Sequence, residues 1–309
     1  MKNHVLLSGA SGLIGTALRQ QLTAAGWESR QLVRHKPQNP GEVQWNPGQG
    51  AGPDAAALGN PAVAIHLSGA GIADKRWTEA RKQLIVDSRI QSTRALVTAL
   101  CALDPKPRLL ICASAIGIYG DRGDEVLDET STHGTGFLPH TCEQWEAAAA
   151  EAANSGIRVV SARFGVVLAK QGGALAKMLP LFRLGLGGPL GSGRQWMSWI
   201  SARDTARALA FLADPAQAEG PAVEAVNVVA PDPVTNAAFT RALGRALHRP
   251  AFLPAPAFAL RLAFGEMADA ALLASARVLP RRLQQMGFRF EDATLAGALR
   301  SAIAHSENP

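Results

Sequence analysis

The sequence lacks long apolar runs and is poor in cysteine. Nowhere do about 18 apolar residues follow one another, so we expect no transmembrane helix. The apolar run after Met1 is too short for a signal peptide. The three cysteines, Cys101, Cys112 and Cys142, are odd in number and lack the spacing of metal ligands. We therefore expect reduced thiols, no metal site and a cytoplasmic protein.

The charge balance is only modestly basic. The 309 residues include 31 Lys and Arg against 25 Asp and Glu, a net charge of +6, and the basic residues are not bunched. No known nucleic-acid module accompanies them, so we expect neither nucleic acid nor a membrane as a partner. A small positive excess suits a phosphate-bearing small molecule.

Short apolar segments alternate with helix-type segments over the first 170 residues. Apolar runs at 4–8, 31–33, 62–67, 109–113 and 159–161 are typical of buried parallel strands, and helical spacing follows several of them, at 13–25, 78–100 and 142–154. This alternation predicts an α/β fold with a Rossmann-type, doubly wound parallel sheet over residues 1–170. Residues 171–309 then form a smaller, mostly helical region on the substrate side, with a strand near 226–229 returning to the sheet.

A glycine motif, GxxGxxG, follows the first predicted strand and opens the first predicted helix. Gly9 permits a tight turn, Gly12 lets the backbone approach a pyrophosphate, and Gly15 lets the helix pack closely on the strand. Free N–H groups at the start of the helix attract phosphate. The predicted cofactor contacts in this motif are Gly9, Ser11, Gly12, Leu13, Ile14 and Gly15.

The second predicted strand ends in Val33-Arg34 where an acidic residue would bind the ribose of NAD(H). A guanidinium at this position grips a 2′-phosphate with two hydrogen bonds and stacks on adenine. Val33 and Arg34 therefore join the predicted cofactor residues, and NADP(H) is the predicted cofactor. A solvated surface arginine is the alternative for Arg34.

Taken together, the motifs resemble an atypical subfamily of the extended short-chain dehydrogenases/reductases, the nucleoside-diphosphate-sugar epimerase-like proteins. They are Gly9 to Gly15, His66 to Gly71, Arg76-Trp77-Thr78, Ser88-Arg89, Trp145 to Ala148, Arg163 to Leu168, Gly187 to Gly193 and Ser198-Trp199-Ile200, with Phe264 to Met267, Pro280 to Leu283 and Gly287 to Phe290 in the tail. The resemblance implies that Leu67, Ser68 and Arg89 contact the cofactor. It also implies a family-specific segment at about 253–300, of unsettled role. For Arg89, a surface ion pair on a polar helix face is the alternative.

The usual proton donor of short-chain dehydrogenases, a tyrosine followed four residues later by lysine, is missing. The only tyrosine is Tyr119, and position 123 is glycine. Alignment on Trp145-Glu146 places Leu138 and Cys142 where the tyrosine and lysine belong, and leucine cannot donate a proton. Tyr119 and Ser114 are the predicted catalytic residues. The nearby Asp121, His140 and Glu143 are further ionisable candidates, although a structural or solvated role is favoured for each of them. After the second glycine cluster, Arg194, Gln195 and Trp199 are candidates for contact with an anionic or aromatic group, with plain packing as the alternative.

Two hypotheses follow. The first is an NADP(H)-dependent oxidoreductase or epimerase-like enzyme that uses a non-standard proton donor on a small-molecule substrate, a nucleotide sugar or another carbonyl compound. The second is a non-catalytic NADP(H)-binding sensor or regulatory protein, because the glycine motif persists while the proton relay is lost. A fold alone does not decide between them.

Overall fold

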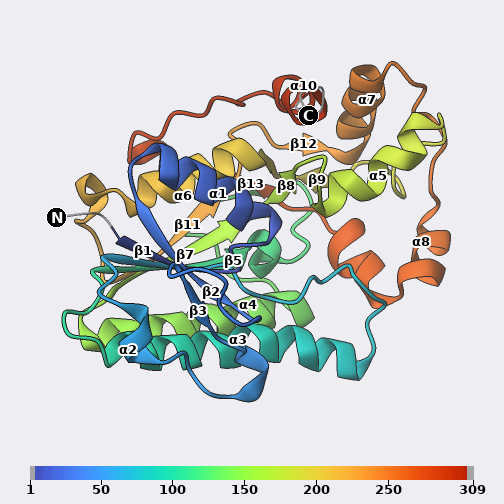
Figure 1. Cartoon of the computed structure of the whole chain (residues 1–309). Coiled ribbons are helices and arrows are strands. Elements are labelled where there is room, and N and C mark those ends of the chain that lie inside the picture. Colours follow the sequence, from blue (N-terminus) through green and yellow to red (C-terminus); the bar gives the residue numbers. More distant parts are fainter. Residues whose placement is uncertain (1–3, 305–309) are drawn as a thin grey trace.

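A seven-stranded parallel sheet organises the computed structural model, which describes residues 4–304 (Figure 1). The first three residues of the expected 1–170 region and the last five of 171–309 lie outside the described residues. The strand order is β11-β7-β5-β4-β1-β2-β3. In chain order these strands are β1 (His4–Ser8), β2 (Glu28–Val33), β3 (Glu42–Gln44), β4 (Val63–His66), β5 (Leu109–Ala115), β7 (Arg158–Phe164) and β11 (Val223–Val228). The predicted Rossmann-type α/β class is confirmed.

Helices cover both faces of the sheet, which is why its central strands are apolar throughout. Helices α1 (Leu13–Ala24) and α6 (Ala202–Ala213) lie side by side on one face, and α3 (Glu79–Cys101) and α4 (Phe137–Ala150) cover the other (Figure 1). Strands β4 and β7 are buried along their whole length. The chain moves outward from β1 first through β2 and then, in the other direction, through β4. Ligands of such sheets bind at the carboxyl ends of the strands beside this reversal.

Local chemistry sets where the first helices begin and end. Helix α1 starts directly after Gly12, and the chain leaves it at Gly26, which has the positive φ of 76° that glycine adopts without strain. Helix α3 starts after Thr78, whose side chain accepts a hydrogen bond from the N–H of Arg81.

Several element boundaries differ from the sequence predictions. Strand β3 lies in a Pro- and Gly-rich stretch where no strand is expected, and α4 begins at Phe137, five residues before the predicted start. Pro139 occupies the first turn of α4, where its missing N–H costs no helical hydrogen bond. Helix α6, which follows a Ser201 cap, was also not predicted.

The later part of the chain contributes to the sheet layers and also forms its own apolar cluster. Beyond residue 170, α6 packs beside α1, and β11 pairs in parallel with β7. The second cluster centres on Phe182, Trp199, Phe239 and Leu299. It is built by β8 (Val166–Leu168), β10 (Trp199–Ser201), α5 (Gly173–Arg183), α7 (Asn236–Leu247) and α10 (Leu295–Ala304).

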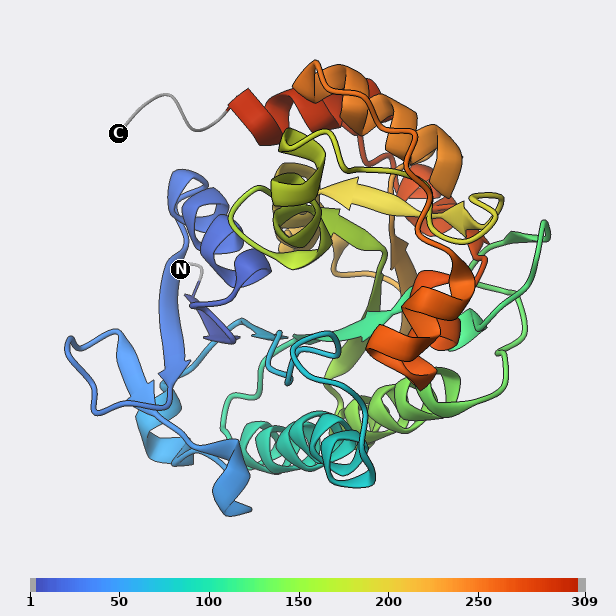
Figure 2. The ribbon, with the colours of Figure 1, turned by 90° about the vertical axis from the view of Figure 1, so that its right-hand side faces the viewer.

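Smaller elements complete the fold, and Figure 2 views the carboxyl edge of the sheet with α1, α5 and α8 placed around it. They are α2 (Ala55–Leu58), α8 (Ala257–Phe264), α9 (Arg281–Gln285), β6 (Val126–Leu127), β9 (Trp196–Met197), β12 (Val234–Thr235) and β13 (Arg277–Val278). Strand β13 pairs with β6, and so ties the C-terminal segment to the loop that follows β5. Within residues 4–304, no helix is long and apolar enough to cross a membrane.

Candidate functional site: a glycine turn beside the strand ends

The turn after β1 lies against the segment that follows β4. Gly9 has a φ of +71°, and a Cβ added to it would lie 2.8 Å from the carbonyl carbon of Leu67. The structure thus brings the predicted glycine motif and the predicted Leu67-Ser68 contact together. Only glycine permits this approach, because any side chain would push the two strand ends apart.

The N-terminus of α1 is open to a ligand. Gly15 packs so closely on the turn that an added Cβ would lie 2.8 Å from the Cα of Ala10. The N–H of Gly12 donates to the carbonyl of Gly9 at 3.0 Å. No side chain caps the helix and no acidic residue lies in its first turn, so the N–H groups of Leu13, Ile14 and Gly15 are available to an anion.

Arg34 stands free at the end of the neighbouring strand. Strand β2 ends at Val33, which is partly buried, and the Arg34 side chain is exposed. Among residues 4–304, Arg34 makes neither a hydrogen bond nor an ion pair, whereas His35 beside it pairs with Glu42. An arginine held by no protein partner keeps all its donors for a ligand.

A buried histidine, which the sequence analysis did not single out, links β1 to β4. The Ser8 hydroxyl and Nδ1 of His66 lie 2.6 Å apart, one residue before Gly9 and Leu67 respectively. Burial lowers the pKa of His66 to about 4, so the ring is neutral at physiological pH. This hydrogen bond fixes the two strand ends whose following residues meet at the glycine turn.

Arg89 holds the loop that follows Ser68. From α3, its Nη1 donates to the carbonyls of Ala70 and Ile85, both at 3.0 Å, and its guanidinium lies over the ring of Trp145. Ser68, which directly precedes this loop in the sequence, is partly buried. In the structure Arg89 therefore binds two backbone carbonyls and a tryptophan ring and, within residues 4–304, does not form the surface ion pair considered above.

The two predicted catalytic hydroxyls lie in one buried polar network. Tyr119 is fully buried, and its hydroxyl donates to Oδ1 of Asn227 at 2.8 Å and accepts from Nη1 of Arg163 at 2.9 Å. Burial raises the pKa of Tyr119. The Ser114 hydroxyl donates to Glu146 at 2.6 Å, and Glu146 binds Arg163 through both its carboxylate oxygens. These partners favour a positioning role for both hydroxyls over proton donation.

Glu146 and Arg163 were not proposed as site residues, yet both occur in the motifs that carry the family resemblance. The ion pair between them could be recognised only from the structure, because α4 and β7 come together only in the folded chain. Arg163 is buried at the end of β7 and Glu146 is partly buried on α4, and the ion pair between them is the centre of the network.

Leu138 and Cys142, which occupy the positions of the standard tyrosine and lysine, both lie in apolar surroundings. Leu138 packs in a cluster with Trp77, Ile85 and Met267. Cys142 is buried, and burial raises the pKa of its thiol to about 12. As placed, neither position offers a proton at neutral pH.

The other site residues considered from the sequence lie in different environments. His140 and Glu143 lie on the solvent side of α4, and Asp121 accepts from the backbone N–H of Ser275. Gln195 is buried and donates to the carbonyls of Leu190 and Leu272. Trp199 is fully buried, and Arg194 is exposed. Among the described residues, no three His, Cys, Asp or Glu side chains gather into an arrangement that holds a metal ion.

Comparison with known proteins assigns this architecture to a family. Residues 5–228 match the NAD dependent epimerase/dehydratase family, and residues 255–302 match a domain of unknown function, DUF1731. The chain belongs to the NAD dependent epimerase/dehydratase family. The predicted kinship with epimerase-like short-chain dehydrogenases is therefore confirmed.

The relatives match almost end to end. An epimerase family protein of Mycobacterium bovis is 47% identical over 295 residues, covering 96% of both chains. The epimerase family protein YfhF of Bacillus subtilis is 38% identical over 306 residues, covering 97% of this chain and 98% of the relative.

A solved structure of a human family member superposes closely. The crystal structure of human epimerase family protein SDR39U1 (isoform 2) with NADPH has a TM-score of 0.87 at 34% identity, covering 97% of this chain and 99% of that one. MoeE5 in complex with UDP-glucuronic acid and NAD has a TM-score of 0.77 at 20% identity, covering 97% and 98%. At that identity, the second likeness shows the fold alone.

Proposed function

We propose that this chain binds NADP(H) across the glycine turn, with Arg34 selecting the 2′-phosphate. The observation that carries the proposal is the exposed Arg34 at the end of β2, which has no partner among residues 4–304, beside the uncapped start of α1. Support comes from the human relative SDR39U1, which was crystallised with NADPH.

Each part of the site has a task in this proposal. The N–H groups of Leu13, Ile14 and Gly15 face the pyrophosphate, with Gly9, Ser11 and Gly12 giving it room. Val33 and Arg34 contact the adenosine half, where the guanidinium forms charge-assisted hydrogen bonds. Leu67 and Ser68 line the path toward the nicotinamide, and Arg89 positions the loop that follows them.

We further propose that the chain is an oxidoreductase or epimerase-like enzyme acting on a small carbonyl compound or nucleotide sugar. The bound cofactor would supply hydride transfer. Tyr119 and Ser114 act in this proposal as positioning residues, because reaching a substrate would require both hydroxyls to leave buried partners. They keep Arg163 and Glu146 in place at the carboxyl ends of β5 and β7.

The same burial favours a second function, a non-catalytic NADP(H)-dependent sensor. Leu138 lies in an apolar cluster and the Cys142 thiol stays protonated, so neither replaces the standard proton donor. In this case cofactor binding would change which partners the protein captures, without any turnover.

Calorimetry with NADPH and NADH tests the cofactor assignment. We expect the wild type to prefer NADPH and Arg34→Ala to lose roughly ten- to hundredfold of that preference, since one charge-assisted contact disappears. Arg19→Ala, which removes an exposed arginine from α1, is the control and should change nothing. An unchanged NADPH/NADH ratio in Arg34→Ala would remove Arg34 from the selector role.

Turnover separates the enzyme from the sensor. Purified protein with NADPH and a panel of carbonyl compounds and nucleotide sugars should lose nicotinamide absorbance if it is an enzyme. Bound NADPH without turnover across the panel argues for the sensor. Partner capture that is identical with NADP⁺, NADPH and no cofactor would end the sensor hypothesis.

A further inference from the structure

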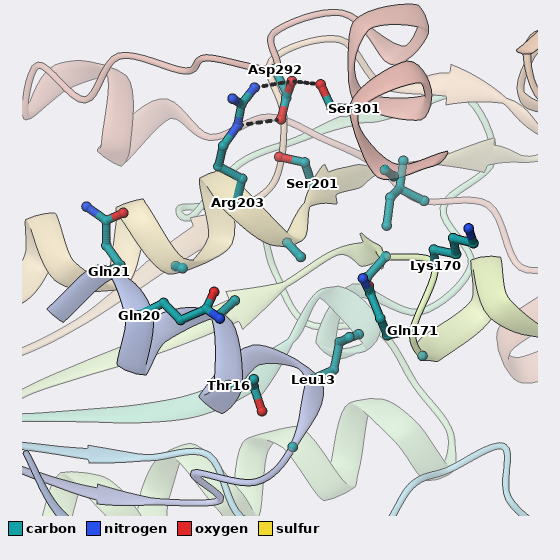
Figure 3. Close-up of a pocket in the computed structure, with 18 of the residues that line it drawn as sticks. Leu13, Thr16, Gln20, Gln21, Lys170, Gln171, Ser201, Arg203, Asp292 and Ser301 are labelled. Atoms are coloured by element: carbon teal, nitrogen blue, oxygen red, sulfur yellow. Dashed lines mark hydrogen bonds and ion pairs between the residues drawn. The ribbon is translucent and has the colours of Figure 1, made fainter. Parts of the chain in front are cut away.

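A cavity of about 680 Å³ lies beside the glycine turn, along helix α1, and Arg34 does not line it (Figure 3). Helix α1, the loop between β8 and α5, the start of α6, and α10 with the segment before it line this cavity. Its volume falls within the range of about 300–1,000 Å³ that is usual for small-molecule sites. It shares only Ser11, Gly12 and Leu13 with the proposed cofactor contacts.

The charges around this cavity favour an anionic ligand. The Asp292 carboxylate is already satisfied, because Arg203 reaches both its oxygens, at 2.7 and 3.2 Å, and Ser301 donates to it as well. Lys170 lies on the opposite wall and is partly buried. Within the described part of the chain, Lys170 has no hydrogen-bond or ion-pair partner. One positive charge, without an ion-pair partner among the described residues, therefore lies at the rim of the cavity.

The wall formed by α1 favours a polyhydroxylated ligand. Thr16 and Gln20 project from this helix at the edge of the cavity (Figure 3). Neither side chain hydrogen-bonds to another residue of the described range, and nor does Gln171 across the cavity. Amide and hydroxyl groups both donate and accept, which matches the hydroxyls of a sugar or polyol.

We propose that this cavity is a second binding site, for a small phosphorylated polyol, and that its occupancy strengthens dinucleotide binding. The phosphate pairs with Lys170 and the hydroxyls bind Gln20 and Thr16.

Leu13 connects the two sites. It is the first residue of α1, and its side chain lies so close to the β8–α5 loop that a Cβ added to Gly172 would be 3.3 Å from its Cδ1. A ligand that spans Lys170 and Gln20 clamps this loop onto the helix whose N–H groups face the pyrophosphate. The coupling rests on the proposed NADP(H) site, whereas binding in the cavity does not.

Calorimetry on the full chain with saturating NADPH tests the cavity, with the dinucleotide groove occupied. The probes are glucose 6-phosphate, ribose 5-phosphate and glycerol 3-phosphate, each compared with its neutral parent and with inorganic phosphate. We expect saturable binding of at least one phosphorylated probe, at least about tenfold tighter than either half alone. Failure of all three probes to bind overturns the proposal.

Variants locate the bound probe. Lys170→Met should weaken it about tenfold or more, Lys170→Arg should restore it, and Gln20→Ala should weaken it several-fold. The controls are Lys106→Met and Thr23→Ala, which alter an exposed lysine far along the chain and an exposed residue of α1 itself. Equal affinity in Lys170→Met and the wild type overturns the assignment to this cavity.

The coupling has its own measurement. The Kd for NADPH should fall about fivefold with the probe saturating, and the Kd for the probe should fall by the same factor with NADPH, because linkage is reciprocal. Tight probe binding with an unchanged NADPH Kd overturns the coupling alone. Probe binding in a protein that does not bind NADPH would overturn the proposed function and leave the cavity assignment standing.

Discussion

The hydroxyl of Tyr119 donates to Oδ1 of Asn227 at 2.8 Å across a sequence separation of 108 residues. The bond joins the segment after β5 to the last strand of the sheet, and Arg163 from β7 donates to the same hydroxyl. One phenol thus satisfies polar groups from two strands in the interior. Loss of such a group leaves buried partners unpaired, and this is more costly than the hydrogen bond itself.

Tyr119→Phe should therefore destabilise the fold by about 1–3 kcal/mol. The free energy of unfolding in urea measures this cost. A double-mutant cycle with Asn227→Leu should show coupling between the two sites. In our proposal NADPH binding stays near wild type. A stable Tyr119→Phe protein whose turnover drops about 100-fold or more would support the catalytic role predicted from the sequence.

Gly15→Ala should weaken both the fold and NADPH binding. Its new Cβ would lie 2.8 Å from the Cα of Ala10, so α1 must move off the turn that presents its N–H groups. We expect a loss of about 1–3 kcal/mol in stability, as for other overpacked sites. The matched control is Gly48→Ala, whose Cβ would lie 3.4 Å from the flexible side chain of Asn46. Equal NADPH affinity in the two variants would contradict the close packing.

The sequence predicted the elements that local patterns define. A buried apolar strand, three spaced glycines and a helix stop at Gly26 are all encoded within 25 residues, so the cofactor turn was predictable. Strand β3 (Glu42–Gln44) was not predictable, because a strand of three residues at the edge of the sheet is too short to show a hydrophobic alternation. Helix α6 was missed although Ser201 and Asp204 mark its start, and the amphipathic pattern after them was the available signal.

The catalytic predictions depended on information that lies outside local sequence. Tyr119 and Ser114 are polar residues next to a strand end, and by pattern alone such residues face a substrate. Their burial follows from Asn227 and Glu146, which are 108 and 32 residues away. Partners this distant are brought together only by the packing of β11, β5 and α4, so the sequence could not show whether either hydroxyl is free.

Acidification should loosen the glycine turn through His66. Unfolded His66 binds a proton near its ordinary pKa of 6.5, whereas the folded protein holds that pKa at about 4 by burial. The unfolded state therefore gains protons first, so the stability is fully present above about pH 6.5 and is lost as the pH falls toward 4. The difference of 2.5 pH units corresponds to about 3 kcal/mol.

His66→Gln removes this titration. Unfolding free energies measured between pH 7 and 4 should fall more steeply in the wild type than in the variant. NADPH affinity should fall over the same range, because the Ser8–His66 hydrogen bond fixes both strand ends at the turn. His140→Gln, on the exposed side of α4, is the control and should keep the wild-type slope. Parallel profiles for wild type and His66→Gln would show that the ring does not titrate in this way.

The buried pair of Glu146 and Arg163 should respond to substitution far more strongly than an exposed pair nearby. Arg163 is 4% exposed and binds both oxygens of Glu146, so Glu146→Gln leaves a buried guanidinium without its counter-charge. We expect a loss of about 3–5 kcal/mol in the free energy of unfolding.

The chain supplies its own control just after α4. Glu151 pairs with Arg94 at 3.1 Å, but both side chains are about half exposed, so Glu151→Gln should cost at most about 1 kcal/mol. Urea unfolding of the two variants compares the same chemical change in two environments. Equal losses would mean that water reaches the Glu146–Arg163 pair. In that case the network would be open enough for Ser114 and Tyr119 to exchange protons with a substrate, which would support the catalytic roles predicted for them.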